Sequence, residues 1–340
     1  MRSFTCPVCA HLVFFHNSEC LHCGSLLGFD VETRGMAIAD DSNVRCSNAD
    51  LAQCNWWVRP DGTHDGLCLS CRLTRTRPAA DDAEALVAFA DAESRKRWLV
   101  FQLLELGLPV VPYDEGTDSG LAFDLLSSRF DQVMIGHEDG LITLDLAEAD
   151  DAHRERIRED MGEPYRTVLG HFRHEIGHYY WDVLIDGHDD RLGEFRRLFG
   201  DETLDYGEAL DRHYSAGPPP DWADRFVSRY ATMHPWEDWA ETFAHYLHIR
   251  DGLETAAAFG LQTTGPAVDV AGDVVQSARP TPETGELSAD ELIAEWLALT
   301  AALNAMSRSL GNDDLYPFVL APVVMAKLAM VHRTVGEFAG

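Results

Sequence analysis

The sequence predicts an α+β protein in which a cysteine-rich module precedes an α-rich domain that contains a small β-hairpin or sheet. Three observations support this prediction. All eight cysteines lie between Cys6 and Cys71, apolar residues recur at helical spacing in several later segments, and one hairpin signal interrupts those helical patterns. The 340 residues also exceed what one small core needs. We therefore expect two domains, comprising residues 1–78 and residues 79–340.

The charge of the chain is strongly negative and unevenly distributed. The formal net charge is −30. Residues 1–78 contain seven Lys or Arg and eight Asp or Glu, which leaves −29 on the large domain. A polyanion would be repelled by such a molecule, so nucleic acid is disfavoured as a partner. We interpret the acidity as a solubility feature of the surface.

The opening residues predict a cytoplasmic protein, because no continuous apolar stretch of a secretory signal precedes the cysteines. The most apolar late stretch, residues 315–330, contains two prolines and a lysine. It is also shorter than the ~20 residues that a membrane helix needs. We expect this stretch to be buried core, and we expect no contact with a membrane.

The cysteines form two sets of four. Each Cys-x-x-Cys pair places two thiolates on one tight turn, and two such turns can surround one tetrahedral zinc ion at about 2.3 Å per sulfur. The second set is looser, because seven residues separate Cys46 from Cys54. The spacing also allows an iron centre of the rubredoxin type, whereas cytosolic glutathione disfavours disulfides. We interpret the sets as two structural zinc sites, held by Cys6, Cys9, Cys20 and Cys23 and by Cys46, Cys54, Cys68 and Cys71.

Four histidines near these cysteines are surplus to the proposed ligands. Each site already has four thiolates, so we expect the imidazoles to face solvent. They are His11, His16, His22 and His64.

The large domain begins after a linker at residues 75–82, where a basic turn gives way to acidic residues. Helical spacing of apolar residues predicts one long helix or two over residues 83–106, and a further helix near residues 192–199. Asp139-Gly140 between two β-rich runs predicts a hairpin over residues 133–146. An edge strand of such a hairpin could bind a substrate backbone.

Two later segments are interpreted from their composition. Gly217 and the three prolines after it break the chain, and we expect a helix over residues 222–230. Residues 261–288 are low in aromatics and rich in Thr, Gly, Pro and Asp. This composition predicts a flexible excursion that is either disordered or a lid.

The chemistry of the chain is concentrated in the five residues His-Glu-Ile-Gly-His. His174 and His178 are four residues apart, so a helix places both imidazoles on one face, where they can bind one zinc ion. Glu175 is then positioned to act as the general base on a water molecule that the zinc activates. This pattern is typical of zinc peptidases.

A third ligand must come from another segment. The metzincin extension is excluded, because it requires glycine and histidine where this chain has Trp181 and Leu184. A glutamate on a second helix is the other known arrangement, and residues 235–248 contain two candidates, Glu237 and Glu241. They are one turn apart, so one can bind the metal while the other holds a ligating histidine. Spacing alone does not choose between them.

The motifs HEIGHYYW and PWEDWAETFAHYLH, after an N-terminal module written FTCPVC and CLHCGSLLGF, resemble a bacterial family of zinc-binding metallopeptidases with an N-terminal zinc ribbon. The resemblance implies a zincin-like fold for the large domain. The second helix is also similar to that of the lethal factor and Mlc titration factor gluzincins. That similarity implies that Glu237 binds zinc and Glu241 holds a histidine. It further implies that Tyr230, seven residues before Glu237, offers its phenol to the developing oxyanion.

We therefore expect a zinc peptidase with one catalytic and two structural zinc ions and a peptide or protein substrate. The main alternative is a catalytically silent zinc-binding module whose ribbon binds a protein partner. A second alternative is nucleic-acid binding through three ribbon arginines, which the acidic domain disfavours. Other histidines are expected to pack in the core or lie at the surface. The arginines are Arg72, Arg75 and Arg77, and the histidines are His171, His234, His245 and His248.

Overall fold

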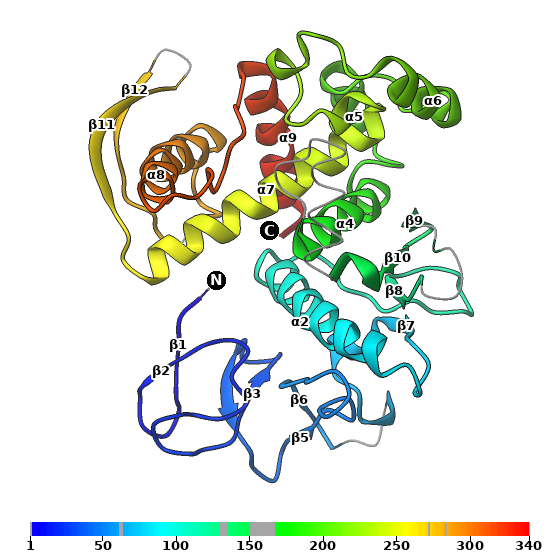
Figure 1. Cartoon of the computed structure of the whole chain (residues 1–340), viewed down its shortest axis with the longest axis vertical. Coiled ribbons are helices and arrows are strands. Elements are labelled where there is room, and N and C mark those ends of the chain that lie inside the picture. Colours follow the sequence, from blue (N-terminus) through cyan, green and yellow to red (C-terminus); the bar gives the residue numbers. More distant parts are fainter. Residues whose placement is uncertain are drawn as a thin grey trace.

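The computed structural model describes residues 2–60, 64–128, 133, 135–149, 167–270, 273–282 and 284–339. Short strand pairs build the N-terminal part, and the rest consists of long helices, a small mixed sheet at one side and one further strand pair (Figure 1). The α+β class that the sequence predicts is therefore confirmed.

The N-terminal module consists of three two-stranded antiparallel pairs and a short helix. Its brief strands leave seven of the cysteines on turns and loops, and Cys71 lies in the short helix. The pairs are β1 (Phe4–Thr5) with β2 (Leu12–Val13), β3 (Leu27–Asp30) with β4 (Gly35–Ile38), and β5 (Val44–Arg45) with β6 (Trp57–Val58), followed by a 3-10 turn (His64–Gly66) and α1 (Leu69–Arg72).

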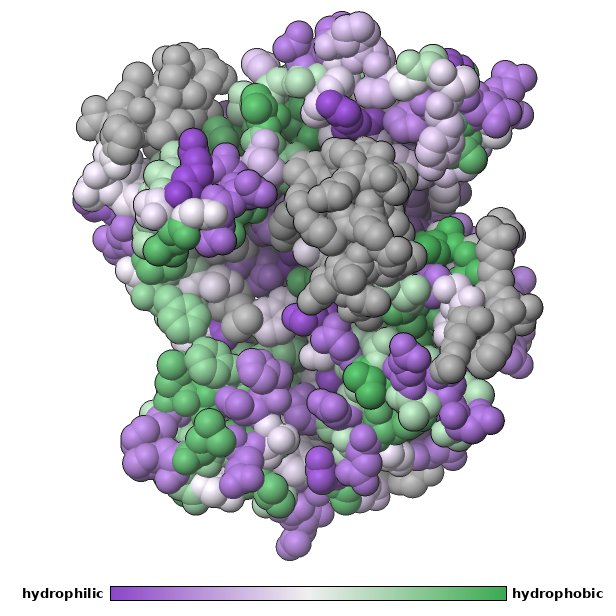
Figure 2. All heavy atoms as spheres, in the orientation of Figure 1, coloured by the Kyte–Doolittle hydropathy of each residue, from purple (hydrophilic) through white to green (hydrophobic). Residues whose placement is uncertain are grey.

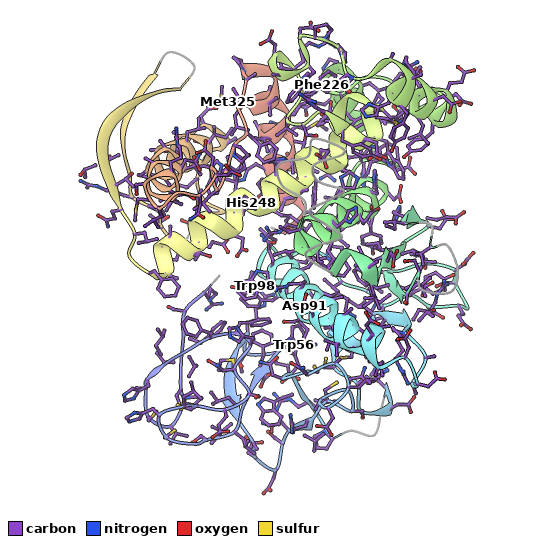
Figure 3. All side chains as sticks on the ribbon, in the orientation of Figure 1. Trp56, Asp91, Trp98, Phe226, His248 and Met325 are labelled. Carbon is purple, nitrogen blue, oxygen red and sulfur yellow. The ribbon has the colours of Figure 1, made fainter. Side chains whose placement is uncertain are left out.

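An aromatic cluster joins this module to the long helix α2 (Ala83–Glu105). The ring of Phe101 on α2 lies 4.9 Å from Phe15 and 5.4 Å from Phe29, both in the module. Figure 3 shows Trp98 at the border between α2 and the module, with Trp56 below it, and Phe15 packs edge-on against both indoles. The predicted helix over residues 83–106 is thus confirmed as one continuous element with a face buried against the module.

A four-stranded sheet with the order β7-β8-β10-β9 lies on the other side of α2. Strand β7 (Thr74–Thr76) and β8 (Ala122–Leu126) are parallel, as are β8 and β10 (Leu141–Asp145). Strand β9 (Gly136–Glu138) pairs antiparallel with β10, and Asp139-Gly140 forms the turn between them. The predicted hairpin is confirmed, and β9 is the edge strand of the sheet.

Two helices, α4 (Val168–Leu184) and α7 (Pro235–Ala258), pack against each other in the centre of the large domain (Figure 1). They approach closely because Gly177 has no side chain: a Cβ there would lie 2.9 Å from the Cα of Ala240. The Trp239 indole N–H also donates to the Gly177 carbonyl at 2.9 Å. Further helices surround this pair, namely α5 (Asp189–Leu198), α6 (Tyr206–Ala216), α8 (Ala289–Ser309) and α9 (Pro322–Ala339).

The expected helix over residues 222–230 is wrong. The segment instead contains two 3-10 turns, Trp222–Asp224 and Tyr230–Thr232. The hydroxyl of Ser228 accepts the Ala231 N–H at 3.1 Å. Such a local bond from side chain to backbone competes with helical hydrogen bonding, which explains the difference.

The expected disorder of residues 261–288 is also wrong for the residues that the structure describes there. Strands β11 (Thr263–Val270) and β12 (Asp273–Ala278) form an antiparallel hairpin that packs on α8. The low aromatic content was misleading, because the strands are rich in Val and Thr, which favour β-structure as well as aromatics do. Across the described helices, none combines the length and the apolar character needed to cross a membrane.

The aromatic contact between the module and α2 predicts a stability effect. Phe101 is only 4% exposed, so Phe101→Ala should lower the free energy of unfolding by about 3–5 kcal/mol through lost burial and a cavity. Chemical denaturation followed by tryptophan fluorescence measures this. Val87→Ala on the solvent side of α2, where the side chain is 73% exposed, is the matched control and should change stability by less than about 0.5 kcal/mol. Equal stability of the two variants would contradict the proposed role of the cluster.

Candidate metal and catalytic site

The side chains of His174, His178 and Glu237 converge at the junction of α4 and α7. The two histidines lie one turn apart on α4, and Glu237 lies in the first turn of α7. The His174 Nε2 atom is 3.2 Å from His178 Nε2 and 3.0 Å from Glu237 Oε2. His178 Nε2 is 3.4 Å from the same carboxylate oxygen. All three residues are buried.

These separations suit a single small metal ion. Two ligands of a tetrahedral zinc, each about 2.05 Å from the metal, are about 3.3 Å apart. Two imidazole nitrogens and one carboxylate oxygen are also a donor set that catalytic zinc sites use, with a fourth position left for water or substrate. The residues present therefore fit a zinc ion.

Glu241 contacts the outer side of the first histidine. Its Oε1 lies 2.7 Å from His174 Nδ1, and its Oε2 accepts the Ser228 hydroxyl hydrogen at 2.5 Å. A carboxylate in this position fixes the tautomer of the histidine, so that Nε2 is free to bind a metal. Glu237 is the glutamate that reaches both histidines, and the three side chains form a group that could hold a metal ion.

Electrostatics at this junction follow from burial and pairing. Burial lowers the pKa of His174, but its hydrogen bonds to Glu237 and Glu241 outweigh that effect and hold the pKa well above its usual value. Burial raises the pKa of Glu237, while the charges and hydrogen bonds of the two histidines lower it well below its usual value. These opposed shifts reflect the attraction between the imidazole and the carboxylates, and zinc binding at such a site releases protons because its ligands must be deprotonated.

A cavity of about 650 Å³ opens beside these residues. Glu175 and Tyr230 both line it, together with His174 and Glu241. The Tyr230 ring lies 5.7 Å from the His174 ring, and burial raises the pKa of its phenol well above 10.0. Among the described residues that line the cavity, none belongs to residues 1–78.

Several residues at the site were missed by the sequence analysis. Tyr206 donates its hydroxyl hydrogen to Glu237 Oε1 at 2.9 Å. The rings of Trp236 and His137 pack on the His178 ring, with centroids 3.8 Å and 6.1 Å away. Trp236 stands next to Glu237 in the motif and could have been noted. Tyr206 and His137 lie far from the motifs in sequence, and no sequence signal marks them.

The four other histidines, which we expected in the core or at the surface, either pack in the interior or line the cavity. His234 is the N-cap of α7, where its Nδ1 accepts the Trp236 N–H at 3.1 Å. His245 is buried, lies 2.9 Å from the Tyr316 hydroxyl and has a pKa lowered to about 4 by burial. His171, His245 and His248 line the cavity. None of the four belongs to the group of possible metal ligands at this junction, as far as the structure describes the chain.

The two sets of cysteines are each gathered around one point. The Cys6–Cys23 and Cys9–Cys20 sulfur pairs are 3.7 Å and 3.6 Å apart, and the Cys54–Cys68 pair is 3.6 Å apart. Sulfurs bound to one tetrahedral zinc are about 3.8 Å apart, whereas a disulfide joins them at about 2.05 Å. All eight cysteines are free thiols and group in the two predicted sets.

Local backbone geometry explains how each Cys-x-x-Cys pair forms its turn. In the first site the N–H of Ala10 donates to the Cys6 carbonyl at 2.9 Å, and that of Gly24 donates to the Cys20 carbonyl at 2.8 Å. Both donors have positive φ, 59° and 71°. In the second site Cys68 caps α1, and its sulfur accepts the Cys71 N–H at 3.5 Å. The surplus histidines are exposed as expected, namely His11, His16, His22 and His64.

Comparisons with known proteins agree with this division of sites. Residues 85–334 match the family model described as "Putative zinc-binding metallo-peptidase", and residues 3–82 match a zinc-ribbon domain. Uncharacterized proteins of Mycobacterium tuberculosis and Mycobacterium bovis are each 52% identical to the chain over 341 residues. Each alignment covers 100% of this chain and 96% of the relative. No solved structure matches the chain.

The contact between Glu241 and His174 predicts an effect on zinc affinity. Glu241→Ala removes the acceptor that orients the imidazole, so the affinity of this site for zinc should fall about 10–100-fold. Competition with a chelator measures the affinity, and a His178→Ala variant identifies which zinc equivalent belongs to the site. Glu254→Ala on the same helix is the control, because its carboxylate contacts Arg250 and Thr284 instead. An unchanged affinity in Glu241→Ala would refute the role given to this carboxylate.

Proposed function

We propose that the chain, which belongs to the "Putative zinc-binding metallo-peptidase" family, is an active zinc-dependent peptidase of the gluzincin type. The observation that carries this proposal is the junction of α4 and α7. Two imidazoles and one carboxylate surround a single position there, and Glu175 lines a cavity beside it.

A zinc ion at this position would lower the pKa of a water molecule and polarise a peptide carbonyl. Glu175 takes a proton from the attacking water and later delivers it to the leaving amine, as a general base and then a general acid. Tyr230 donates its hydroxyl hydrogen to the oxygen on which negative charge develops. Glu241 keeps His174 in the orientation that binds the metal.

We further propose that strand β9 binds the backbone of a peptide or protein substrate. Among the described strands β9 pairs with β10 alone, so an extended peptide could add to its other edge. His137 of β9 packs on His178, and nearby Ile135 lines the cavity. A peptide along this edge would therefore pass beside Glu175.

The ribbon module contributes two further zinc ions in this proposal, which gives three per chain. The sulfur separations in both four-cysteine sites support zinc coordination by all eight cysteines. Structural zinc sites of this kind contribute folding free energy rather than catalysis.

The general-base role of Glu175 yields the decisive experiment. Glu175→Gln should reduce the hydrolysis of an unstructured protein by a factor of about 10²–10⁴ or more, because the amide cannot take the proton. The zinc content should stay at three per chain, as measured by elemental analysis. Glu208→Gln, an exposed carboxylate on α6, should hydrolyse like the wild type. Full activity of Glu175→Gln would end the proposal, as would wild-type hydrolysis that persists after the catalytic zinc is removed.

A catalytically silent protein-interaction module is the second candidate, and one observation favours it. Apolar side chains around the first four-cysteine site are exposed, and Leu21 is 94% exposed. Figure 2 shows hydrophobic residues in green among the purple surface of the N-terminal module, at the bottom of the view. A chain that holds three zinc ions but cleaves no member of a peptide library would favour this candidate over the peptidase.

A further inference from the structure

We propose that Tyr206 is a positioning residue of the metal site, which holds Glu237 as a ligand through one oxygen. The effect that we expect on kcat rests on the proposed function, whereas the effect that we expect on zinc affinity does not depend on catalysis.

The two oxygens of the Glu237 carboxylate have different partners. Oε2 faces the two histidine nitrogens, at 3.0 Å and 3.4 Å. Oε1 accepts the hydroxyl hydrogen of Tyr206 at 2.9 Å. Glu237 is only 2% exposed, so an oxygen that lost this donor would lack a partner in a buried site, which is costly. Tyr206 therefore selects Oε2 as the oxygen that binds a metal.

The backbone around Tyr206 is fixed to the first turn of α7. His234 caps α7 through Nδ1, which leaves its hydrogen on Nε2, and Nε2 lies 3.1 Å from the Leu204 carbonyl. The Tyr206 ring also packs on the His234 ring, with centroids 5.5 Å apart. Asp205 then caps α6 by accepting the Glu208 N–H at 2.8 Å. These contacts hold the start of α6 beside Glu237, so Tyr206 is fixed on rigid backbone with its hydroxyl against the Glu237 carboxylate.

Zinc affinity provides the first test. Tyr206→Phe should weaken zinc binding at this site about 10–100-fold, the range found when partners of metal ligands are removed. Affinity is measured by competition for zinc between the protein and dipicolinic acid. Only the zinc equivalent that the His178→Ala variant fails to bind is counted, because that equivalent belongs to this site. Tyr230→Phe should stay within twofold of the wild type. Tyr113→Phe is the matched control, since that hydroxyl also donates to a carboxylate, Asp118, away from the site. A Tyr206→Phe affinity within twofold of the wild type overturns the proposal.

The visible spectrum of the cobalt-substituted protein provides a second readout. Without the Tyr206 hydroxyl, both oxygens of Glu237 can turn toward the metal, which raises the coordination number and weakens the absorption. We expect this change in Tyr206→Phe and not in Tyr113→Phe. Identical spectra of Tyr206→Phe and the wild type overturn the claim that Tyr206 selects one oxygen.

Kinetics provide a third readout. At saturating zinc, Tyr206→Phe should lower kcat about tenfold or more with little change in KM, because Glu237 no longer holds the metal through one oxygen. An unchanged kcat overturns this kinetic consequence. If the wild-type chain cleaves no peptide, the proposed function fails, and the affinity and cobalt measurements still decide the role of Tyr206.

Discussion

The metal site depends on the close approach of α4 and α7 at one point. Gly177 and Ala240 meet there, and the two helices have the same spacing around the contact. Each small residue lies three positions after one side chain of the site and one position before the next, in His174-x-x-Gly177-His178 and in Glu237-x-x-Ala240-Glu241. A side chain at Gly177 would collide with the backbone of Ala240, so the helices would have to separate. Gly177 therefore contributes to the geometry of the site as the metal-facing side chains do, because it sets the distance between the imidazoles of α4 and the carboxylates of α7.

Each ligand is held by a group from a different part of the chain. His174 is held by Glu241, which in turn accepts from Ser228 in the segment before α7. Glu237 is held by Tyr206 at the start of α6. His178 lies under the ring of Trp236. Because orientation by outer partners determines how well ligands bind a metal, the segments that connect α4 to α7 serve the site as much as the two helices do. Irregular backbone at residues 222–232 is consistent with that use, since it brings Ser228 and Tyr230 to the same place.

The sequence predicted the parts of the site that depend on local periodicity, and missed the parts that depend on tertiary contacts. Four-residue spacing on a helix was enough to pair His174 with His178, and Cys-x-x-Cys turns were enough to group the cysteines. The choice between Glu237 and Glu241 needed a resemblance, because both lie on one face of one helix. Tyr206 could not be found at all, because its contact with Glu237 spans 31 residues. The two wrong elements have different origins. Ser228 accepts a backbone N–H three residues later in the chain, which competes with helical hydrogen bonding. The low aromatic content of residues 261–288 favoured a prediction of disorder over one of strands.

The ribbon module is connected to α4 and α7 through α2 rather than across the cavity. On one side, Arg97 of α2 donates to the Gln53 carbonyl of the module at 3.2 Å. On the other side, Gln102 donates to the Leu247 carbonyl of α7 and accepts from Arg173 of α4 at 3.2 Å. A buried ion pair between Lys96 and Glu93, both of which bond to Thr74 of β7, ties the end of the module to the same helix. The described wall of the cavity contains no ribbon residue. In the part of the chain that the structure describes, a change in the module can reach the site through α2 or through the pairing of β7 with β8. The module therefore supports the helices of the site and does not line the cavity.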